Sequence, residues 1–290
     1  MAPKVRCRRI EDADAERVVT LLTRGFAARR PRGFWEHVFA YLQTRALPAD
    51  APRYGFLLES DGAAVGAILQ MFSGLPAGAG DQKALRCNVS SWYVDADFRS
   101  YAPLLVSQAL KQKEVTYLNI SSAPHTRPIV EAQGYIRYAD GVFVALAWLS
   151  PASAGIPVRI VPAGAQPQAP FEAYERDLLK DHAECGCISL WCETPERAYP
   201  FVFRARRVKG FINCAQLIYC RDVADFVRFA RPLGRYLAWR GRPVVILDAN
   251  GPVPGLRGKY FDDTMPKYFK GPLRPRLGDL AYTETAFFGI

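Results

Sequence analysis

The alternation of hydrophobic and polar positions over residues 1–150 predicts both strands and helices. Apolar residues at every second position, or in short runs, predict strands at Val5–Ile10, Tyr54–Glu59, Ala63–Phe72, Ala84–Val94, Val115–Ile120 and Val142–Trp148. Apolar residues three or four positions apart predict helices at residues 12–26, Phe34–Leu42, residues 99–109 and His125–Gln133. This order predicts an α/β protein, more closely an α+β fold with one mixed sheet and a right-handed β-α-β crossover.

The pattern of the first half returns after a Pro-, Gly- and Ala-rich tract, Ser150–Pro170. There we expect helices at Phe171–His182 and, by correspondence with the crossover helix, at Phe226–Leu237. We expect strands at Val158–Val161, Ile188–Glu193, Tyr199–Arg206, Asn213–Cys220 and Pro243–Asp248. The segment Tyr93–Pro124, which contains the crossover helix and the next strand, aligns with the segment 128 residues later. Six residues are identical in the two segments: Ala96, Asp97, Phe98, Ala102, Leu105 and Pro124. About two such identities would arise by chance at average composition. The sequence therefore predicts two related domains, residues 1–150 and a divergent copy at residues 151–290.

Composition and charge narrow the class of protein. Half of the 290 residues are hydrophobic and 23% are charged, which is enough apolar surface for two cores and excludes a disordered chain. No apolar run reaches the ~18 residues of a membrane helix, and the first residues lack the apolar stretch of a signal peptide. We therefore expect a cytoplasmic protein without a membrane partner. The formal charge of +10 favours a phosphate-bearing ligand, but its basic residues are scattered, so nucleic acid is not expected.

Seven cysteines, an odd number, favour reduced thiols over a disulfide framework. His182, Cys185, Cys187 and Cys192 could supply four zinc ligands, or Cys185 or Cys187 could carry an acyl group with His182 as its base. Cysteines within an apolar strand are more often small buried hydrophobes. We therefore predict no metal site.

The first half resembles the GNAT superfamily of acyl-CoA-dependent N-acyltransferases over Val5–Trp148. The resemblance rests on the element order, on Arg99 at the start of the crossover helix and on Gly134-Tyr135 at the end of the next helix. It implies two GNAT-like domains in tandem. It also implies that the strand before the crossover parts from its neighbour through a bulge, and that acyl-CoA lies in this wedge with its diphosphate at a helix N-terminus.

The resemblance also implies a set of site residues. Acyl-CoA, with acetyl-CoA as the expected form, would contact Val94, Arg99, Ser100, Tyr101, Ala102, Leu104, Asn119 and Ser122. The acceptor would lie near Asn88, Ser90 and Trp92. The candidate proton-transfer groups are Glu59, Asp97 and His125, and no spacing singles out one of them. The closing segment could also cross a ligand cleft and contribute Tyr260, Tyr268, Asp279 or Glu284.

Two departures from the GNAT pattern concern the phosphate loop and the general acid. Ala102 and Leu104 stand where the family has glycines, and Pro103 between them has no N–H to offer a phosphate. Val130 stands where the family often has a catalytic tyrosine.

The resemblance predicts an acyltransferase that moves an acyl group from acyl-CoA to a small-molecule or peptide amine. One alternative is a non-catalytic GNAT-like module that senses a CoA ester or holds a protein partner. Another is a transferase that uses aminoacyl-tRNA, for which the positive charge gives mild support. The sequence leaves open the acceptor, the acyl chain, the working half and the oligomeric state.

Overall fold

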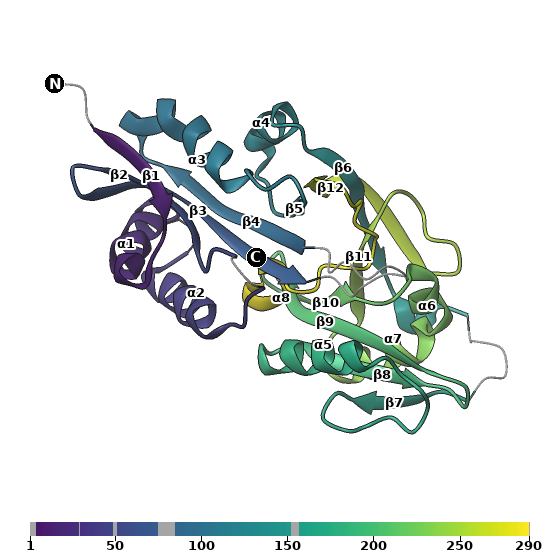
Figure 1. Ribbon diagram of the computed structural model, residues 1–290. Helices are drawn as coiled ribbons and strands as arrows, with labels where there is room; N and C mark the ends of the chain where they lie inside the picture. The colour runs from purple at the N-terminus through teal and green to yellow at the C-terminus, as the bar shows by residue number, and fades with distance from the viewer. Residues whose placement is uncertain (1–3, 29, 49–50, 75–84, 152–156, 290) are drawn as a thin grey trace. The chain divides into compact units, whose positions relative to one another are not determined.

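The computed structural model describes residues 4–28, 30–48, 51–74, 85–151 and 157–289. The chain forms two compact units (Figure 1). Unit 1 comprises residues 1–119 and 270–273, and unit 2 comprises residues 120–269 and 274–290. None of the helices in the described ranges is long and apolar enough to cross a lipid bilayer.

Unit 1 is a five-stranded sheet with helices on both faces (Figure 1). Its strands, in spatial order, are β1 (Val5–Arg9), β2 (Gly55–Ser60), β3 (Ala63–Gly74), β4 (Leu85–Val94) and β5 (Val115–Asn119). Among the strands described in this unit, β4 and β5 are the one parallel pair, as a crossover connection requires. Its helices are α1 (Ala15–Gly25), α2 (Arg32–Thr44) and α3 (Ala102–Ala109), with 3-10 helices at Asp12–Asp14 and Ala96–Tyr101.

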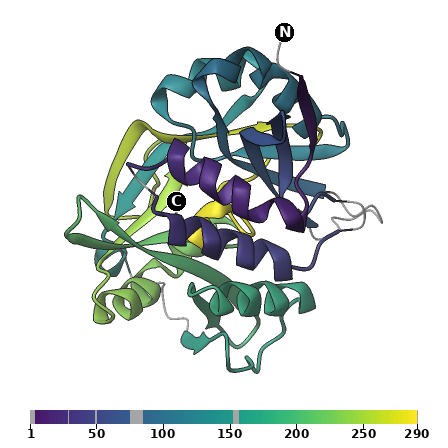
Figure 2. The same ribbon diagram turned by 90° about the vertical axis from the view of Figure 1, so that its left-hand side faces the viewer.

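Helices α1 and α2 lie side by side on one face of this sheet (Figure 2). Helix α1 buries Val18, Leu21 and Leu22, which recur at the spacing of one helix face. Helix α2 buries Trp35 and Phe39 in the same way. The sequence therefore fixes which side of each helix faces the sheet.

Unit 2 is a seven-stranded sheet to which both halves of the sequence contribute. Its strands, in spatial order, are β12 (Gly258–Lys270), β6 (Ile136–Ala145), β11 (Val244–Ala249), β10 (Ile212–Tyr219), β9 (Ala198–Val208), β8 (Ile188–Glu193) and β7 (Arg159–Pro162). Its helices are α4 (Arg127–Ala132), α5 (Ala173–Glu184), α6 (Val223–Arg228), α7 (Ala230–Trp239) and α8 (Glu284–Phe288), with 3-10 helices at Pro124–Thr126 and Ala147–Leu149.

The core of unit 2 lies between its sheet and helices α6 and α7. Phe201 and Phe203 of β9 pack against Phe226 and Phe229, and all four side chains are fully buried. Gly234 lets α7 approach the Ala147–Leu149 turn closely, because a Cβ at this position would lie 2.2 Å from the backbone nitrogen of Trp148. No other residue type fits there without displacing the backbone.

The parallel pairs of the two units have equivalent registers. Pairing between β4 and β5 ends at Asn88↔Leu118, and pairing between β10 and β11 ends at Gln216↔Ile246. Both members of the second pair follow those of the first by 128 residues, the shift found in the sequence. This agreement supports the tandem arrangement.

The predicted elements are confirmed, with differences at three boundaries. Strand β6 begins at Ile136, six residues before the predicted start at Val142, because Asp140 and Gly141 interrupt the apolar alternation but not the strand. It ends at Ala145 and not at Trp148, because Ala147–Leu149 form a 3-10 helix. The crossover helix is α-helical only from Ala102. Ala84, at the start of a predicted strand, and residues 152–156 of the Pro-, Gly- and Ala-rich tract lie outside the described residues.

Strand β6 also bears on the predicted domain boundary. It lies within the predicted first domain, yet it pairs with both β11 and β12 in unit 2. The two compact units meet in the chain between Asn119 and Ile120. A division into domains at residue 150 stays a prediction.

Candidate functional site

In unit 1 the pairing between the parallel strands β4 and β5 ends well before β4 does, because β5 stops at Asn119. The two strands pair from Leu85↔Val115 to Asn88↔Leu118. On its other edge, β4 stays paired with β3 as far as Val94. The far part of β4 therefore has an edge that does not pair with β5, and we call this edge, together with the end of β5, the wedge.

A bulge in β4 lies at this wedge. Ser90 pairs with Leu69 and Tyr93 with Ala67, so that Ser91 and Trp92 both stand opposite a single residue of β3. Ser91 has a φ of 53°, in the left-handed region that residues other than glycine rarely adopt. Such a bulge bends the strand and re-aims the groups beside it.

The three predicted acceptor residues lie on β4 at this point. Asn88 and Ser90 are buried, and the Asn88 side-chain amide donates to the carbonyl of Leu118 at 3.4 Å, across the last paired position. Trp92 is partly buried. Its indole Nε1 is buried and makes no hydrogen bond within the described part of the chain, although buried polar groups nearly always have a partner.

The predicted phosphate loop, at residues 99–104, lies at the end of a 3-10 helix that leads directly into α3. Residues Ala96–Tyr101 form a 3-10 helix, and the N–H of Ala102 is taken by the carbonyl of Arg99. Pro103 follows and has no N–H to offer. Arg99, Ser100 and Leu104 are exposed, whereas Tyr101 and Ala102 are partly buried. A diphosphate at this loop would therefore contact fewer backbone amides than a glycine-rich loop provides.

The other predicted residues are more scattered. Asn119 ends β5, and Asp97 is exposed in the first turn of the 3-10 helix. His125 is exposed in unit 2. Ser122, also in unit 2, has a buried hydroxyl oxygen without a hydrogen bond among the described residues.

Glu59 already has two cationic partners. Its carboxylate lies 2.8 Å from Arg8 Nη2 and 3.0 Å from Arg17 Nη2. The hydrogen bond from Arg8 lowers the pKa of Glu59, so the group stays ionised and is a weak proton acceptor. This arrangement does not favour Glu59 as a catalytic base.

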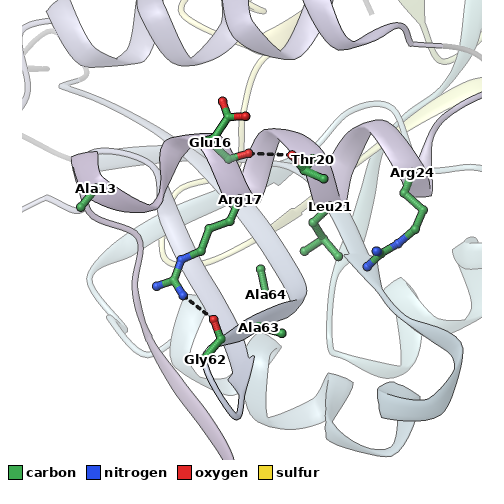
Figure 3. A pocket seen from close by; sticks show the side chains of 9 residues that line it. All are labelled: Ala13, Glu16, Arg17, Thr20, Leu21, Arg24, Gly62, Ala63 and Ala64. Carbon is green, nitrogen blue, oxygen red and sulfur yellow. Dashed lines mark hydrogen bonds between the residues drawn. The ribbon is translucent and has the colours of Figure 1, made fainter.

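A hollow of about 490 Å³ lies along α1 beside the β2–β3 turn (Figure 3). Figure 3 shows Leu21 and two alanines between Arg17 and Arg24. Both cations are engaged, because Arg17 donates to the carbonyl of Gly62 at 2.7 Å and Arg24 pairs with Asp95 at 2.5 Å. We therefore assign no chemistry to this hollow.

In unit 2 the corresponding parallel strands are β10 and β11, whose pairing also ends early, at Gln216↔Ile246. There the C-terminal segment pairs with the edge of β10 that β11 leaves. Beyond the last pair with β11, the N–H of Cys220 donates to the carbonyl of Gly278 at 2.9 Å. The N–H of Leu280 donates to the carbonyl of Ile218 at 2.7 Å. The segment Gly278–Leu280 thus pairs with the part of β10 that has left β11.

The helix start in unit 2 is also closed by the protein itself. Asp222 accepts a hydrogen bond from the N–H of Ala224 at 2.7 Å and caps α6. Arg276 donates to the carbonyl of Cys220 and lies 5.0 Å from the centre of the Tyr219 ring. The closing segment thus crosses a wedge, as the sequence suggested, but it does so chiefly through its backbone. The signal that the sequence offered for this path was the glycine at position 278, whose φ of 76° few other residues adopt.

The structure does not bring His182 together with the cysteines as a set of metal ligands within its described ranges. Among the residues that the structure describes, no group of three or more metal-ligating side chains lies together. His182 is fully buried, with Nδ1 at 2.7 Å from the carbonyl of Leu178 and Nε2 accepting the N–H of Tyr282 at 3.1 Å. Burial raises the pKa of the Cys187 thiol to about 11, which disfavours a nucleophilic thiolate.

Comparison with solved structures assigns the fold. A GCN5-related N-acetyltransferase from Anabaena variabilis ATCC 29413 superimposes with a TM-score of 0.59 at 9% identity, covering 92% of this chain and 72% of that one. A putative acetyltransferase from Pyrococcus horikoshii gives 0.58 at 13% identity, with 96% and 93% covered. The chain has the GNAT fold. Eis1 from Mycobacterium abscessus gives 0.52 at 14% identity, with 96% and 73% covered. No protein-family model and no curated protein matches the sequence.

The end of β4–β5 pairing at Asn88↔Leu118 agrees with the predicted parting of these strands. The position at which the family often has its general acid carries no tyrosine. Val130, at the position of the family's tyrosine, is 1% exposed and belongs to the core.

Proposed function

We propose that the protein transfers an acyl group from acyl-CoA to an amine in the wedge of unit 1. The observation that carries this proposal is the end of β4–β5 pairing at Asn88↔Leu118, next to a bulge at Ser91 and Trp92. An extended pantetheine arm has amide groups that can pair with a strand edge, and a parted strand offers such an edge.

The residues of unit 1 fit the pantetheine arm better than the diphosphate. The wedge provides strand backbone for the pantetheine amides. In the phosphate loop, by contrast, the N–H of Ala102 is already bonded to the carbonyl of Arg99, and Pro103 has no N–H. Arg99, which is exposed at this loop, is the cation we assign to the phosphates. We therefore expect the diphosphate to contribute less to binding than a helix N-terminus with free amides would.

The chemistry needs few side chains. A neutral amine attacks the thioester carbonyl, a C–N bond forms, the C–S bond breaks and the thiol leaves with the proton lost by the amine. Backbone N–H groups at the β4 bulge, near Trp92 and Val94, would stabilise the oxyanion of the tetrahedral intermediate. Binding and orientation would then supply most of the rate enhancement.

We assign the reaction to unit 1 because the two wedges differ. In unit 2, Gly278–Leu280 holds the strand edge and Asp222 caps the helix. We therefore expect one acyl-CoA per chain.

Calorimetric titration with acetyl-CoA and with acetyl-pantetheine tests the binding. We expect one site per chain and a loss of less than about tenfold in affinity without the nucleotide, since a factor of ten corresponds to about 1.4 kcal/mol. Thiol release with a panel of amines tests the transfer. No binding of either compound, or two sites per chain, would contradict the proposal.

The buried Val130 and the wound phosphate loop favour one alternative, a module that binds a CoA ester without turning it over. Binding of acetyl-CoA with no thiol released by any amine would support this alternative. A ligand at 100 times its dissociation constant stabilises a protein by about 2.7 kcal/mol, so thermal unfolding would detect either function.

A further inference from the structure

One edge of unit 2 presents aromatic side chains among cations. We call it the cationic edge and define it as Arg207, Lys209, Phe211, Trp239, Arg240 and Arg242. Trp239 is 91% exposed and Phe211 is 75% exposed, more than any other large hydrophobic side chain that the structure describes. Exposure of this kind is costly in water unless a partner covers it.

The two aromatic residues lie at the same end of neighbouring strands. Phe211 precedes Cys214 by three residues, Trp239 precedes Val244 by five, and Cys214 and Val244 are partners in the parallel β10–β11 pair. Strands in such a pair are ~4.8 Å apart, so the hairpin tip and the end of α7 share one edge.

Both segments are ordered by their own hydrogen bonds. The hairpin closes at Val208↔Ile212. Helix α7 ends in a closed turn, because Gly241, with a φ of 74°, donates to the carbonyl of Ala238 and Arg242 donates to that of Leu237, both at 2.9 Å. Phe211 and Trp239 are therefore exposed on segments whose backbone is fixed by hydrogen bonds.

The charged side chains of the cationic edge are all positive. It contains Arg207, Lys209, Arg240 and Arg242, and neither residues 204–213 nor residues 228–242 include an Asp or Glu. Arg240 also stacks on the ring of Tyr236 at 3.6 Å, which keeps its guanidinium close to the end of α7. A surface of this charge attracts anions.

We propose that the cationic edge docks unit 2 on an anionic lipid surface. Tryptophan and phenylalanine insert into the interface between headgroups and acyl chains, and surrounding Lys and Arg side chains bind the anionic headgroups. Such binding needs no apolar helix, only a few inserted aromatic residues and a basic rim. Separate protruding tips suit insertion into a lipid surface better than stacking of successive bases along a groove.

Sedimentation of the full chain with phosphatidylglycerol-containing vesicles, and with pure phosphatidylcholine vesicles, tests this proposal. We expect binding to the anionic vesicles that weakens with salt. Trp239→Ala should lose about tenfold or more in affinity, as burial of a large apolar side chain is lost. Arg240→Ala with Arg242→Ala should lose about fivefold for each charge removed. Trp239→Phe should retain most of the binding.

Two control variants match these changes. Lys111→Ala with Lys113→Ala removes two exposed charges at the positions of unit 1 that correspond, through the 128-residue shift, to Trp239 and Gly241. Leu273→Ala removes an apolar side chain that is 46% exposed elsewhere. Both should bind the anionic vesicles like the parent protein.

Three results would overturn the proposal. The first is equal vesicle binding by all variants, or no vesicle binding by the parent. The second is binding of single-stranded RNA that Trp239→Ala abolishes, with no vesicle binding. The third is a self-association that Trp239→Ala dissolves, again without vesicle binding. Acyl transfer does not enter this test, so its outcome is independent of the proposed reaction.

Discussion

Leu280 donates its backbone N–H to the carbonyl oxygen of Ile218 at 2.7 Å, at the point where β10 has left β11. The hydrogen bond joins residues more than sixty positions apart. It places the C-terminal segment on the strand edge that, in unit 1, we assign to pantetheine. The same fold therefore presents two different surfaces in its two copies.

The path of the C-terminal segment should depend on Gly278. A Cβ there would lie 2.6 Å from Cys220 Sγ, and φ is 76°. We expect Gly278→Ala to lower the free energy of unfolding by about 1–2 kcal/mol for the backbone and about 1–3 kcal/mol for the clash.

Urea unfolding measures this change, and two variants separate its parts. Gly241→Ala has a similar φ of 74° with no atom near its Cβ, so it should show the backbone cost alone. Adding Cys220→Ala should remove the extra cost of Gly278→Ala after correction for the loss of the sulfur. A Gly278→Ala variant no less stable than Gly241→Ala would count against this path.

Asp14 should make unit 1 sensitive to acid. It is buried, and the hydrogen bond from Arg8 holds its pKa well below the usual range. Its contribution to stability is therefore present above the unfolded-state pKa of about 3.9 and is lost as pH falls toward the folded-state value. We expect Asp14→Asn to cost about 1–3 kcal/mol at pH 7 and progressively less below pH ~4.

Urea unfolding over this pH range gives the comparison with the parent protein. Glu59→Gln is a matched control, because Glu59 pairs with the same two arginines. The Glu59 carboxylate is more exposed than that of Asp14, so its loss should lower the free energy of unfolding at pH 7 by less. A constant difference between Asp14→Asn and the parent from pH 7 to pH 3 would be inconsistent with this role.

The bulge in β4 should tolerate glycine and reject β-branched residues. Ser91 has a φ of 53°, which glycine adopts freely. Ser91→Gly should therefore stay within about 1 kcal/mol of the parent, whereas Ser91→Val should cost about 1–3 kcal/mol. Thermal unfolding without ligand tests the bulge, and the shift caused by acetyl-CoA tests the wedge. Stability of Ser91→Val equal to that of Ser91→Gly would argue against the bulge.

A cysteine nucleophile is not expected at Cys187. Its thiol donates to the carbonyl of Ala286 at 3.2 Å, and with a pKa of about 11 roughly one thiol in ten thousand is ionised at pH 7. Cys187→Ser should keep the rate of thiol release from acetyl-CoA within about twofold, since no covalent step depends on it. An acyl group found on Cys187 by mass spectrometry, with activity lost in the variant, would reverse this expectation.

Local pattern was sufficient for most of the elements. Helix α1 and strands β8 and β10 follow from the spacing of apolar residues, because a buried face imposes its period on the sequence. The positions of Asn88 and Trp92 beside the wedge followed from the resemblance. The interaction of Glu59 with Arg8 could not be foreseen, because it joins residues fifty-one positions apart through the register of β1 on β2.

The sequence by itself predicted the repeat, which the equivalent registers of the two parallel pairs support. Across the shift of 128 residues, the apolar positions of one helix face and one strand recur. The last pairs of the two parallel strand pairs, Asn88↔Leu118 and Gln216↔Ile246, are related by the same shift. Only the tertiary structure decided that Gly278–Leu280 fills one wedge and that β6 lies between β11 and β12. Pairing between distant segments depends on the strand edges left available once the sheet has formed, and no local period records that choice.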